Sequence, residues 1–419
     1  MIIDRLFRSL GADRLGIAFA ILIATLVASC SSAPLSSMIT SSSLSNKKAP
    51  PPAAIPVQPR PAKIAMLLPL GSQDASAPIA KAMKQAGEMA LFDFNNPMIQ
   101  LVVKDDRGTL DGAQAAAQEA VRDGAEIILG PLHARSIAGA APVSRASNVP
   151  MISFANDRMA AGNGVYLLTF MAEQEVDRIV SFAMSRGKRR FAALIPSDAY
   201  GAVVEPAFRR ALQKHGGTLV TLANYEPKPE TMVEPVKRVL AEMRAAAQVE
   251  PPVDALFVPA GPDVVPHIGP LLMYSGFDKS RVQLIGTGAW DYLAMRSETA
   301  FAGGWYPSAD PGGFKSFSER FTRTFGYAPP RMATLSYDAV AMSIILAANP
   351  PGQRYTAENL MRPAGFNGTD GLVRFAANGA CERALAVLEV RQSGNWIIDA
   401  APIAGKTPVA AWTSEVVPR

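Results

Sequence analysis

His133, Arg135 and Ser136 form a cluster of polar side chains directly after a short apolar segment, residues 127–129. This segment is too compact and too β-branched for a helix, and a Gly-Pro pair ends it, as is typical of a strand end. An alanine-rich segment with helical spacing follows. At such a strand-to-helix turn of an open α/β sheet, free N–H groups and the positive helix end bind ligands. The pattern therefore predicts a ligand-binding cleft.

Other polar and aromatic residues follow predicted strands in the same way, and we expect them to line that cleft together. The candidate set is His133, Arg135, Ser136, Ser153, Asn156 and Asp157 from the first half, and Tyr200, Gly261, Trp290 and Asp291 from the second. Trp290 is the favoured contact because an exposed aromatic ring can stack on a ligand or a partner. The alternative for Trp290 is a place in the core. Each residue alone could be structural, whereas the set favours a pocket.

Motifs that would indicate an enzyme are missing from the sequence. There is no GxSxG, P-loop or GxGxxG, and SxxK occurs only at 45–48 and 185–188, without SDN or KTG. The three histidines are scattered, and neither CxxC nor HExxH occurs, so we expect no metal and no cofactor. A Ser/His/Asp triad built from distant residues stays open. The prediction is a binding protein without catalytic activity.

Alternating strands and helices must position the candidate residues. In the first half, strands are predicted at 63–71, 99–106, 125–130 and 149–157, with helices between them. This order predicts a parallel sheet with helices on both faces. The same order resumes at 189–201, 218–226, 254–261 and 282–290, which predicts a second doubly wound sheet. A hairpin is predicted within 384–399.

The N-terminus carries a targeting signal. Arginines precede an apolar segment at 17–27, which is short for a membrane span and suits the core of a signal peptide. The following Val-Ala-Ser-Cys resembles a bacterial lipobox. That resemblance implies a signal peptide over 1–29 and lipidation of Cys30, with a plain transmembrane anchor as the alternative. Because Ser31 follows the cysteine, the sorting rule for such lipoproteins implies the periplasmic face of the outer membrane rather than the inner membrane.

Composition limits the remaining choices. The 419 residues are 49% hydrophobic and 18% charged, which suits a globular protein of two or more domains. A formal net charge of +5 without a block of basic residues gives no reason to expect a nucleic-acid partner. Residues 30–62 are rich in Ser and Pro and predict a disordered tether. The sequence has two cysteines, and a lipidated Cys30 cannot form a disulfide, so Cys381 would be unpaired. We expect Cys381 to be buried.

Two similar α/β units followed by a closing GFxGxxGxxxFxxxG segment resemble the type I periplasmic-binding fold of Leu/Ile/Val-type solute-binding proteins. The segment matches Gly365, Phe366, Gly368, Gly371, Phe375 and Gly379. The resemblance implies two doubly wound parallel-sheet lobes that close on a ligand and are joined by three crossings, near 168–175, 301–310 and 363–372. It predicts lobe 1 from 63–170 plus 305–362, lobe 2 from 171–304 plus 363–405, and a tail at 406–419.

Within this superfamily, the lipobox with its tether and the segments 284–293 and 331–342 resemble penicillin-binding-protein activator lipoproteins of alphaproteobacteria. That resemblance implies regulation of a peptidoglycan synthase, although the helical-repeat domain common in those activators is missing here. The alternative is the substrate-binding lipoprotein of an ABC importer for branched-chain or other amino acids. In amino-acid binders of this fold, groups after the third strand hold the ligand carboxylate, which implies Ser136 here. An acid of the second lobe holds the ammonium, and Asp291 lies near that position.

Overall fold

The computed structural model describes residues 60–248, 251–394 and 396–401. The predicted signal peptide, Cys30, nearly all of the predicted tether and the tail at 406–419 lie outside the described residues. Within the described ranges, no helix combines the length and apolar character that crossing a bilayer requires. Cys381 is buried, as predicted, and its burial raises the pKa of its thiol.

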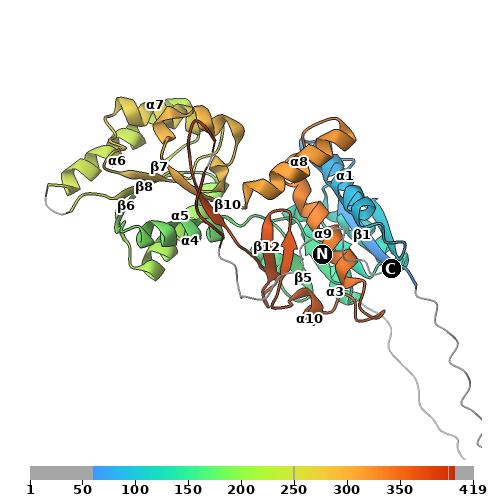
Figure 1. The fold of residues 1–419 in the computed structure, drawn as a ribbon. Coiled ribbons are helices and arrows are strands. Elements are labelled where there is room, and N and C mark those ends of the chain that lie inside the picture. The colour runs from blue at the N-terminus through green and yellow to red at the C-terminus, as the bar shows by residue number, and fades with distance from the viewer. Residues whose placement is uncertain (1–59, 249–250, 395, 402–419) are drawn as a thin grey trace, which may run out of the picture. The chain divides into compact units, whose positions relative to one another are not determined.

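A parallel sheet forms the centre of the first lobe (Figure 1). Among the described residues it has five strands, in the order β2-β1-β3-β4-β5. Their bounds are β1 (Ala62–Leu68), β2 (Ile99–Asp105), β3 (Ile127–Leu129), β4 (Met151–Ser153) and β5 (Val165–Leu167). The predicted strands are present, and β5 is an additional short strand that the sequence analysis did not predict.

Alternation along β1 explains why helices cover both faces of this sheet. Ile64 and Met66 belong to the apolar cluster shared with one set of helices, and Ala65 and Leu67 to the cluster shared with the other. The first set is α1 (Ser76–Phe94), α8 (Pro311–Phe325) and α9 (Ala333–Leu346). The second set is α2 (Leu110–Arg122) and α3 (Ala134–Ala146). The late helices α8 and α9 thus return to the first lobe, as the resemblance implied.

A second sheet forms the centre of the second lobe. Among the described residues it has seven strands, in the order β15-β14-β10-β9-β8-β6-β7. Their bounds are β6 (Arg190–Pro196), β7 (Thr218–Tyr225), β8 (Ala255–Phe257), β9 (Gln283–Ile285), β10 (Trp305–Ser308), β14 (Ala386–Glu389) and β15 (Trp396–Asp399). Strands β6 to β10 are parallel, and the predicted hairpin adds β14 and β15 antiparallel.

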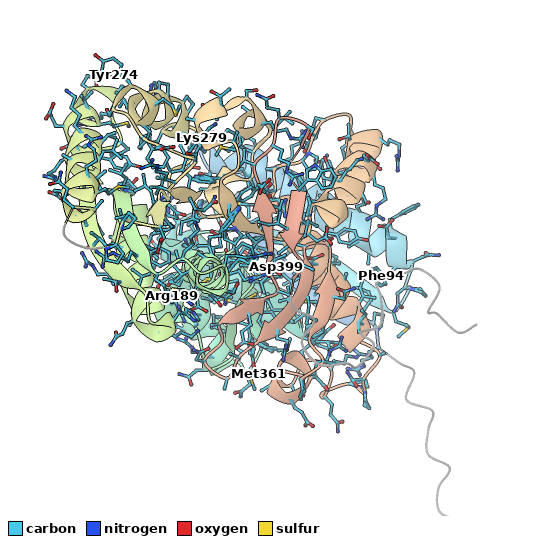
Figure 2. The ribbon with its side chains drawn as sticks, turned by 60° about the vertical axis from the view of Figure 1, so that its left-hand side comes forward. Phe94, Arg189, Tyr274, Lys279, Met361 and Asp399 are labelled. Atoms are coloured by element: carbon cyan, nitrogen blue, oxygen red, sulfur yellow. The ribbon has the colours of Figure 1, made fainter. Side chains whose placement is uncertain are left out.

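Helices cover both faces of the second sheet as well. They are α4 (Ala172–Ser185), α5 (Ala199–His215), α6 (Val233–Ala246) and α7 (Val265–Tyr274). Short 3-10 helices are η1 (Arg158–Ala160), η2 (Pro229–Thr231), η3 (Gly288–Trp290), η4 (Leu293–Ser297) and η5 (Thr299–Phe301). Asp399 of β15, labelled in Figure 2, forms an ion pair with Arg178 of α4. This ion pair connects the edge strand β15 to helix α4.

The late part of the chain differs from the predicted lobe boundaries. Strand β10 belongs to the second sheet. The chain therefore passes from the second lobe to the first at residues 309–310, and not over the whole predicted range 301–310. Residues 363–383 were assigned to lobe 2, but β11 (Phe366–Gly368), β12 (Gly371–Phe375) and β13 (Cys381–Arg383) form a small antiparallel sheet in the core of the first lobe. These strands belong to the first lobe because their apolar side chains are buried in its core. The last crossing is therefore 384–385, and α10 (Ala357–Leu360) precedes the small sheet.

Candidate ligand-binding site

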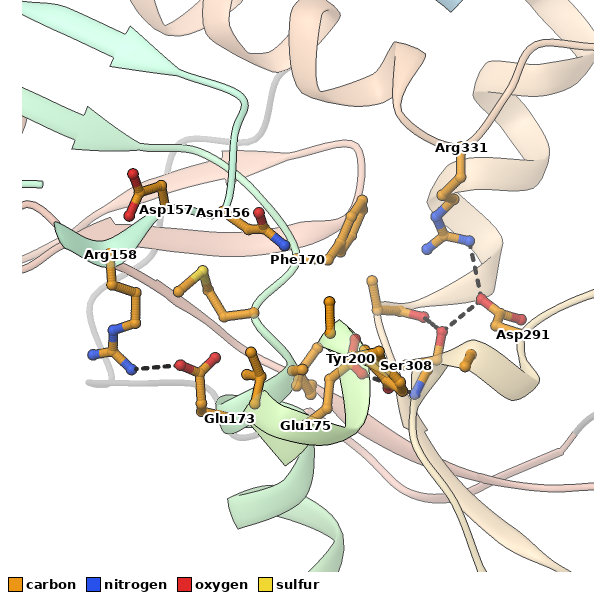
Figure 3. Close-up of a pocket in the computed structure, with 18 residues that line it drawn as sticks. Asn156, Asp157, Arg158, Phe170, Glu173, Glu175, Tyr200, Asp291, Ser308 and Arg331 are labelled. Atoms are coloured by element: carbon orange, nitrogen blue, oxygen red, sulfur yellow. Dashed lines mark hydrogen bonds and ion pairs between the residues drawn. The ribbon is translucent and has the colours of Figure 1, made fainter. Parts of the chain in front are cut away.

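A cleft of about 760 Å³ is lined by residues of both lobes (Figure 3). Its volume lies in the range of small-molecule sites. Its lining residues are Asn156, Asp157, Arg158, Phe170, Met171, Ala172, Glu173, Glu175, Ala199, Tyr200, Val203, Gly288, Ala289, Asp291, Ser308, Ala309, Arg331 and Leu385. The carboxyl ends of parallel strands and the starts of α4 and α5 thus meet at this cleft, which is where open α/β sheets bind ligands.

Four of the ten predicted site residues lie in this lining. Asn156 and Asp157 follow β4, Tyr200 follows β6, and Asp291 follows β9. Their common feature is a position directly after the end of a parallel strand. The Tyr200 hydroxyl is hydrogen-bonded to Oγ1 of Thr287 over 2.7 Å, which fixes the ring at the start of α5. The structure therefore brings these four side chains together as predicted, and their contact with a ligand stays a prediction.

Trp290 is a correction to the sequence analysis. Its side chain is 0% exposed, so the predicted exposed ring is wrong. The ring packs edge-on against Phe301 at 5.1 Å between centroids, and its Nε1 donates a hydrogen bond to the carbonyl of Val258. Gly286 and Gly304 make room for it, since a Cβ at either position would lie within 3 Å of the indole. Trp290 holds the turn that carries Asp291.

The residues after β3 lie outside the lining of the cleft. Ser136 and Ser153 are both fully buried, and the hydroxyl of Ser153 donates to the carbonyl of Pro131. The guanidinium of Arg135 donates to the carbonyl of Gly108 and pairs with Asp74. His133 is the N-cap residue of α3 and is partly exposed. Arg135 and Ser153 thus bind backbone carbonyls of neighbouring turns, whereas the hydroxyl of Ser136 and Nε2 of His133 are buried without a hydrogen-bond partner among the described residues.

Gly261 also lies outside the lining. Its carbonyl accepts hydrogen bonds from the backbone N–H groups of Val264 and Val265, at the start of α7. The role that the structure shows for Gly261 is therefore to begin a helix. Because Gly261 does not line the cleft, its position does not support the prediction that it contacts a ligand.

Several lining residues were missed by the sequence analysis, above all Phe170, Glu173, Glu175, Ser308 and Arg331. The two glutamates lie in the first turn of α4, where acids are common because they complement the helix dipole. Their sequence signal was therefore indistinguishable from ordinary helix stabilisation. Arg331 begins the segment 331–342, which the sequence analysis singled out only for its resemblance.

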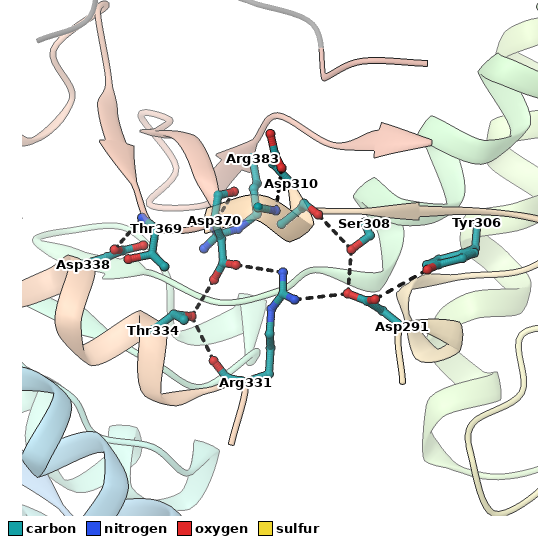
Figure 4. Close-up of polar contacts among 12 residues, drawn as sticks. Asp291, Tyr306, Ser308, Asp310, Arg331, Thr334, Asp338, Thr369, Asp370 and Arg383 are labelled. Atoms are coloured by element: carbon teal, nitrogen blue, oxygen red, sulfur yellow. Dashed lines mark hydrogen bonds and ion pairs between the residues drawn. The ribbon is translucent and has the colours of Figure 1, made fainter. Parts of the chain in front are cut away.

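An ion-pair network joins the two lobes at the cleft (Figure 4). Arg331 of the first lobe contacts Asp291 of the second lobe over 3.2 Å and Asp370 of the first lobe over 2.8 Å. Asp291 also accepts a hydrogen bond of 2.7 Å from the hydroxyl of Ser308. Asp370 is 0% exposed, so Arg331 neutralises a buried carboxylate while it reaches across to Asp291.

Two further carboxylates near this network have raised pKa values. Removal from water raises the pKa of Glu175 to about 7, and the charge of Asp291 adds to the shift. Burial raises the pKa of Asp338 to about 7, and the neighbouring Asp370 acts in the same direction. Among the described residues, no group of three or more His, Cys, Asp or Glu is placed to hold a metal ion. The positive charges of Arg331 and Arg383 act on the pKa of Glu175 in the opposite direction, and Arg383 does so for Asp338.

Comparison with known proteins identifies the family. A sequence model described as "Periplasmic binding protein" matches residues 61–395. The chain belongs to the periplasmic binding protein family. No curated protein matches the sequence. The two-lobed α/β architecture described above is the type I periplasmic-binding fold that the sequence analysis predicted.

Solved structures of periplasmic binding proteins share this fold. An ABC transporter substrate-binding protein from Sphaerobacter thermophilus has a TM-score of 0.65 at 19% identity and covers 82% of this chain and 99% of its own. One from Desulfitobacterium hafniense in complex with Leu has a TM-score of 0.60 at 18% identity, covering 81% and 100%. A solute-binding protein from Rhodopseudomonas palustris BisB5 in complex with 3,4-dihydroxybenzoic acid has a TM-score of 0.56 at 20% identity, covering 83% and 99%.

Proposed function

We propose that this periplasmic binding protein is the solute-binding component of an ABC importer and captures a small organic solute, such as an amino acid, in its cleft. The observation that carries the proposal is the cleft itself. It has the volume of a small-molecule site, and residues of both lobes line it with polar groups at strand ends and helix starts. Two of the similar solved structures hold leucine and 3,4-dihydroxybenzoic acid, which are molecules of that size.

Regulation of a peptidoglycan synthase, the function first expected, has less support. Neither the family match nor the structures named above concern such a partner. The importer alternative agrees better with these likenesses, and we adopt it. Attachment of the protein to a membrane through a lipid on Cys30 belongs to the same proposal and rests on the lipobox-like sequence alone.

A thermal-shift screen of the purified protein tests the proposal. The panel contains the common amino acids, 3,4-dihydroxybenzoate and soluble peptidoglycan fragments. A ligand at 100 times its dissociation constant adds about 2.7 kcal/mol to the free energy of unfolding, enough to raise Tm by a few degrees. We expect a saturable rise with an amino acid or another small solute. A panel in which only peptidoglycan fragments raise Tm, or in which nothing does, would refute importer function.

A further inference from the structure

We propose that Gln174 is the pivot of the two lobes: its side chain fastens the first and third crossings to each other, so that they form a single hinge about which the lobes rotate. The resemblance described above implies that the lobes close, and it leaves open which contacts persist during the motion. The pivot is a property of the protein without solute. It therefore goes beyond the proposed function and does not depend on it.

The first and third crossings lie side by side. The first crossing, residues 168–171, leads from β5 into α4, and the third follows β13. At the end of β5, the N–H of Leu167 donates to the carbonyl of Gly379 over 2.8 Å. The guanidinium of Arg383 lies over the ring of Phe170, 4.7 Å from its centroid. The two crossings therefore contact each other on their way between the lobes.

The outer edge of β13 is occupied by a side chain instead of a strand. Strand β13 pairs with β12 on one side only. The carbonyl of Cys381 and the N–H of Arg383 face away from β12, where a further strand would bind them. The Nε2 of Gln174 donates to this carbonyl, and its Oε1 accepts from this N–H over 3.1 Å. The side-chain amide thus takes the place of a peptide group of a neighbouring strand.

These two hydrogen bonds join the lobes at the hinge itself. Gln174 lies in the first turn of α4, in the second lobe, directly after the first crossing. Arg383 ends β13, in the first lobe, directly before the third crossing. A rotation moves atoms in proportion to their distance from its axis, so groups beside the crossings change their separation least. We therefore expect both bonds of Gln174 to persist when the lobes separate.

A second side chain of α4 fixes the far end of the third crossing. The Nε of Arg178 donates to the carbonyl of Leu385 over 2.8 Å, and its guanidinium pairs with Asp399 of β15. Gln174 and Arg178 lie one helical turn apart, on the same face of α4. Because the junction is held at both ends, the lobes can rotate about it but cannot slide along it. The strand ends of the two lobes then keep facing each other across the cleft.

Hydrogen exchange of the solute-free full-length protein, measured at single amides by mass spectrometry, tests whether the pivot persists. Arg383 and Ala384 form a matched pair. The N–H of Arg383 donates to Gln174 of the other lobe, and that of Ala384 donates to the carbonyl of Leu372 in the same lobe. We expect their protection factors to agree within about 3-fold. A larger deficit at Arg383 would show that its bond breaks as the lobes separate, and would overturn the pivot.

The variant Gln174→Met tests whether the pivot controls the motion. Methionine keeps the length and the helix propensity of glutamine but makes neither hydrogen bond. Distances between the lobes are measured by double electron–electron resonance, with spin labels on Glu88→Cys of α1 and Glu234→Cys of α6, whose side chains are 47% and 84% exposed. Cys30→Ser removes one natural thiol, and the other, Cys381, is fully buried and does not take a label.

We expect the distance distribution of Gln174→Met to be about 1.5-fold wider than that of the protein with the natural Gln174, because the rotation loses its fixed axis. The control is Gln118→Met at an exposed position of α2, which should leave the width unchanged. Gln174 lies outside the lining of the cleft, so the variant removes no solute contact. An unchanged width in Gln174→Met would refute the pivot and would show that Gln174 is only a local hydrogen-bond partner. Because no solute is present, this result would leave the proposed importer function intact.

Discussion

Replacement of Trp290 by alanine should destabilise the second lobe rather than simply remove a ligand contact. The ring is completely buried and packs against Phe301 and Tyr306. Truncation of a buried aromatic side chain to alanine costs about 3–5 kcal/mol, because the removed atoms leave a cavity. Loss of the hydrogen bond to the carbonyl of Val258, which keeps its second hydrogen bond from the N–H of Ala260, adds about 1 kcal/mol. The expected loss is therefore about 4–6 kcal/mol.

Urea unfolding followed by far-UV circular dichroism measures this loss, since that signal does not depend on the tryptophan that is removed. The matched control is Trp396→Ala, because Trp396 is 56% exposed at the edge strand β15. A substitution at such a surface position is expected to change the free energy of unfolding by about 0.5 kcal/mol. Because both variants replace a tryptophan by alanine, the difference between their free energies of unfolding measures the effect of burial.

One result would refute this reasoning. If Trp290→Ala unfolds within 1 kcal/mol of the natural protein and yet loses affinity for a solute that the protein binds, the ring contacts ligand and is not a core residue. A loss of affinity that accompanies a loss of several kcal/mol agrees with the structure, because the turn that carries Asp291 would then be displaced.

Two further predictions concern the backbone at β3 and a buried acid. Gly130→Ala is expected to prevent stable folding, because Gly130 has a φ of +95° and a Cβ there would lie 2.1 Å from the carbonyl oxygen of Leu67. The measurement is Tm by circular dichroism, and a value within 2 °C of that of the natural protein would contradict this prediction. Asp338 has its pKa raised to about 7, so the folded state holds this proton more tightly than the unfolded state, and the free energy of unfolding should fall as pH rises from about 4 to about 7. Asp338→Asn should flatten that fall in urea unfolding at pH 5 and pH 8, and an unchanged difference between the two pH values would show that other groups cause it.

The architecture could be predicted because strands and helices leave strong local patterns. Strands β1 and β6 are long apolar segments with turn residues at their ends, and the alternation of strands with helices implies parallel sheets. The position of the last crossing could not be predicted from such patterns. Glycine-rich segments such as 366–379 suit a hairpin and a crossing equally well, and only the burial of Phe366 and Phe375 in the first lobe decides between them.

The candidate site could be predicted only in part, because the rule that polar residues follow strands does not say which of them face the cleft. Asn156 and Asp291 lie in the lining, whereas Ser136 and Ser153, which obey the same rule, are buried beside turns. Trp290 shows a related limit. An aromatic side chain has the same sequence signal in a core and in a cleft, and the glycines that admit its ring become informative only once their distances are known.

Arg331 connects the fold to the function proposed for the cleft. It belongs to the first lobe and Asp291 to the second, so separation of the lobes would have to break their ion pair. Both side chains are about one quarter exposed, and a pair in such a position contributes only about 1 kcal/mol. A solute can favour the closed lobes only through its larger affinity for that state. A bound solute that contacts both lobes would therefore add to a weak cross-lobe contact that Arg331 and Asp291 already form.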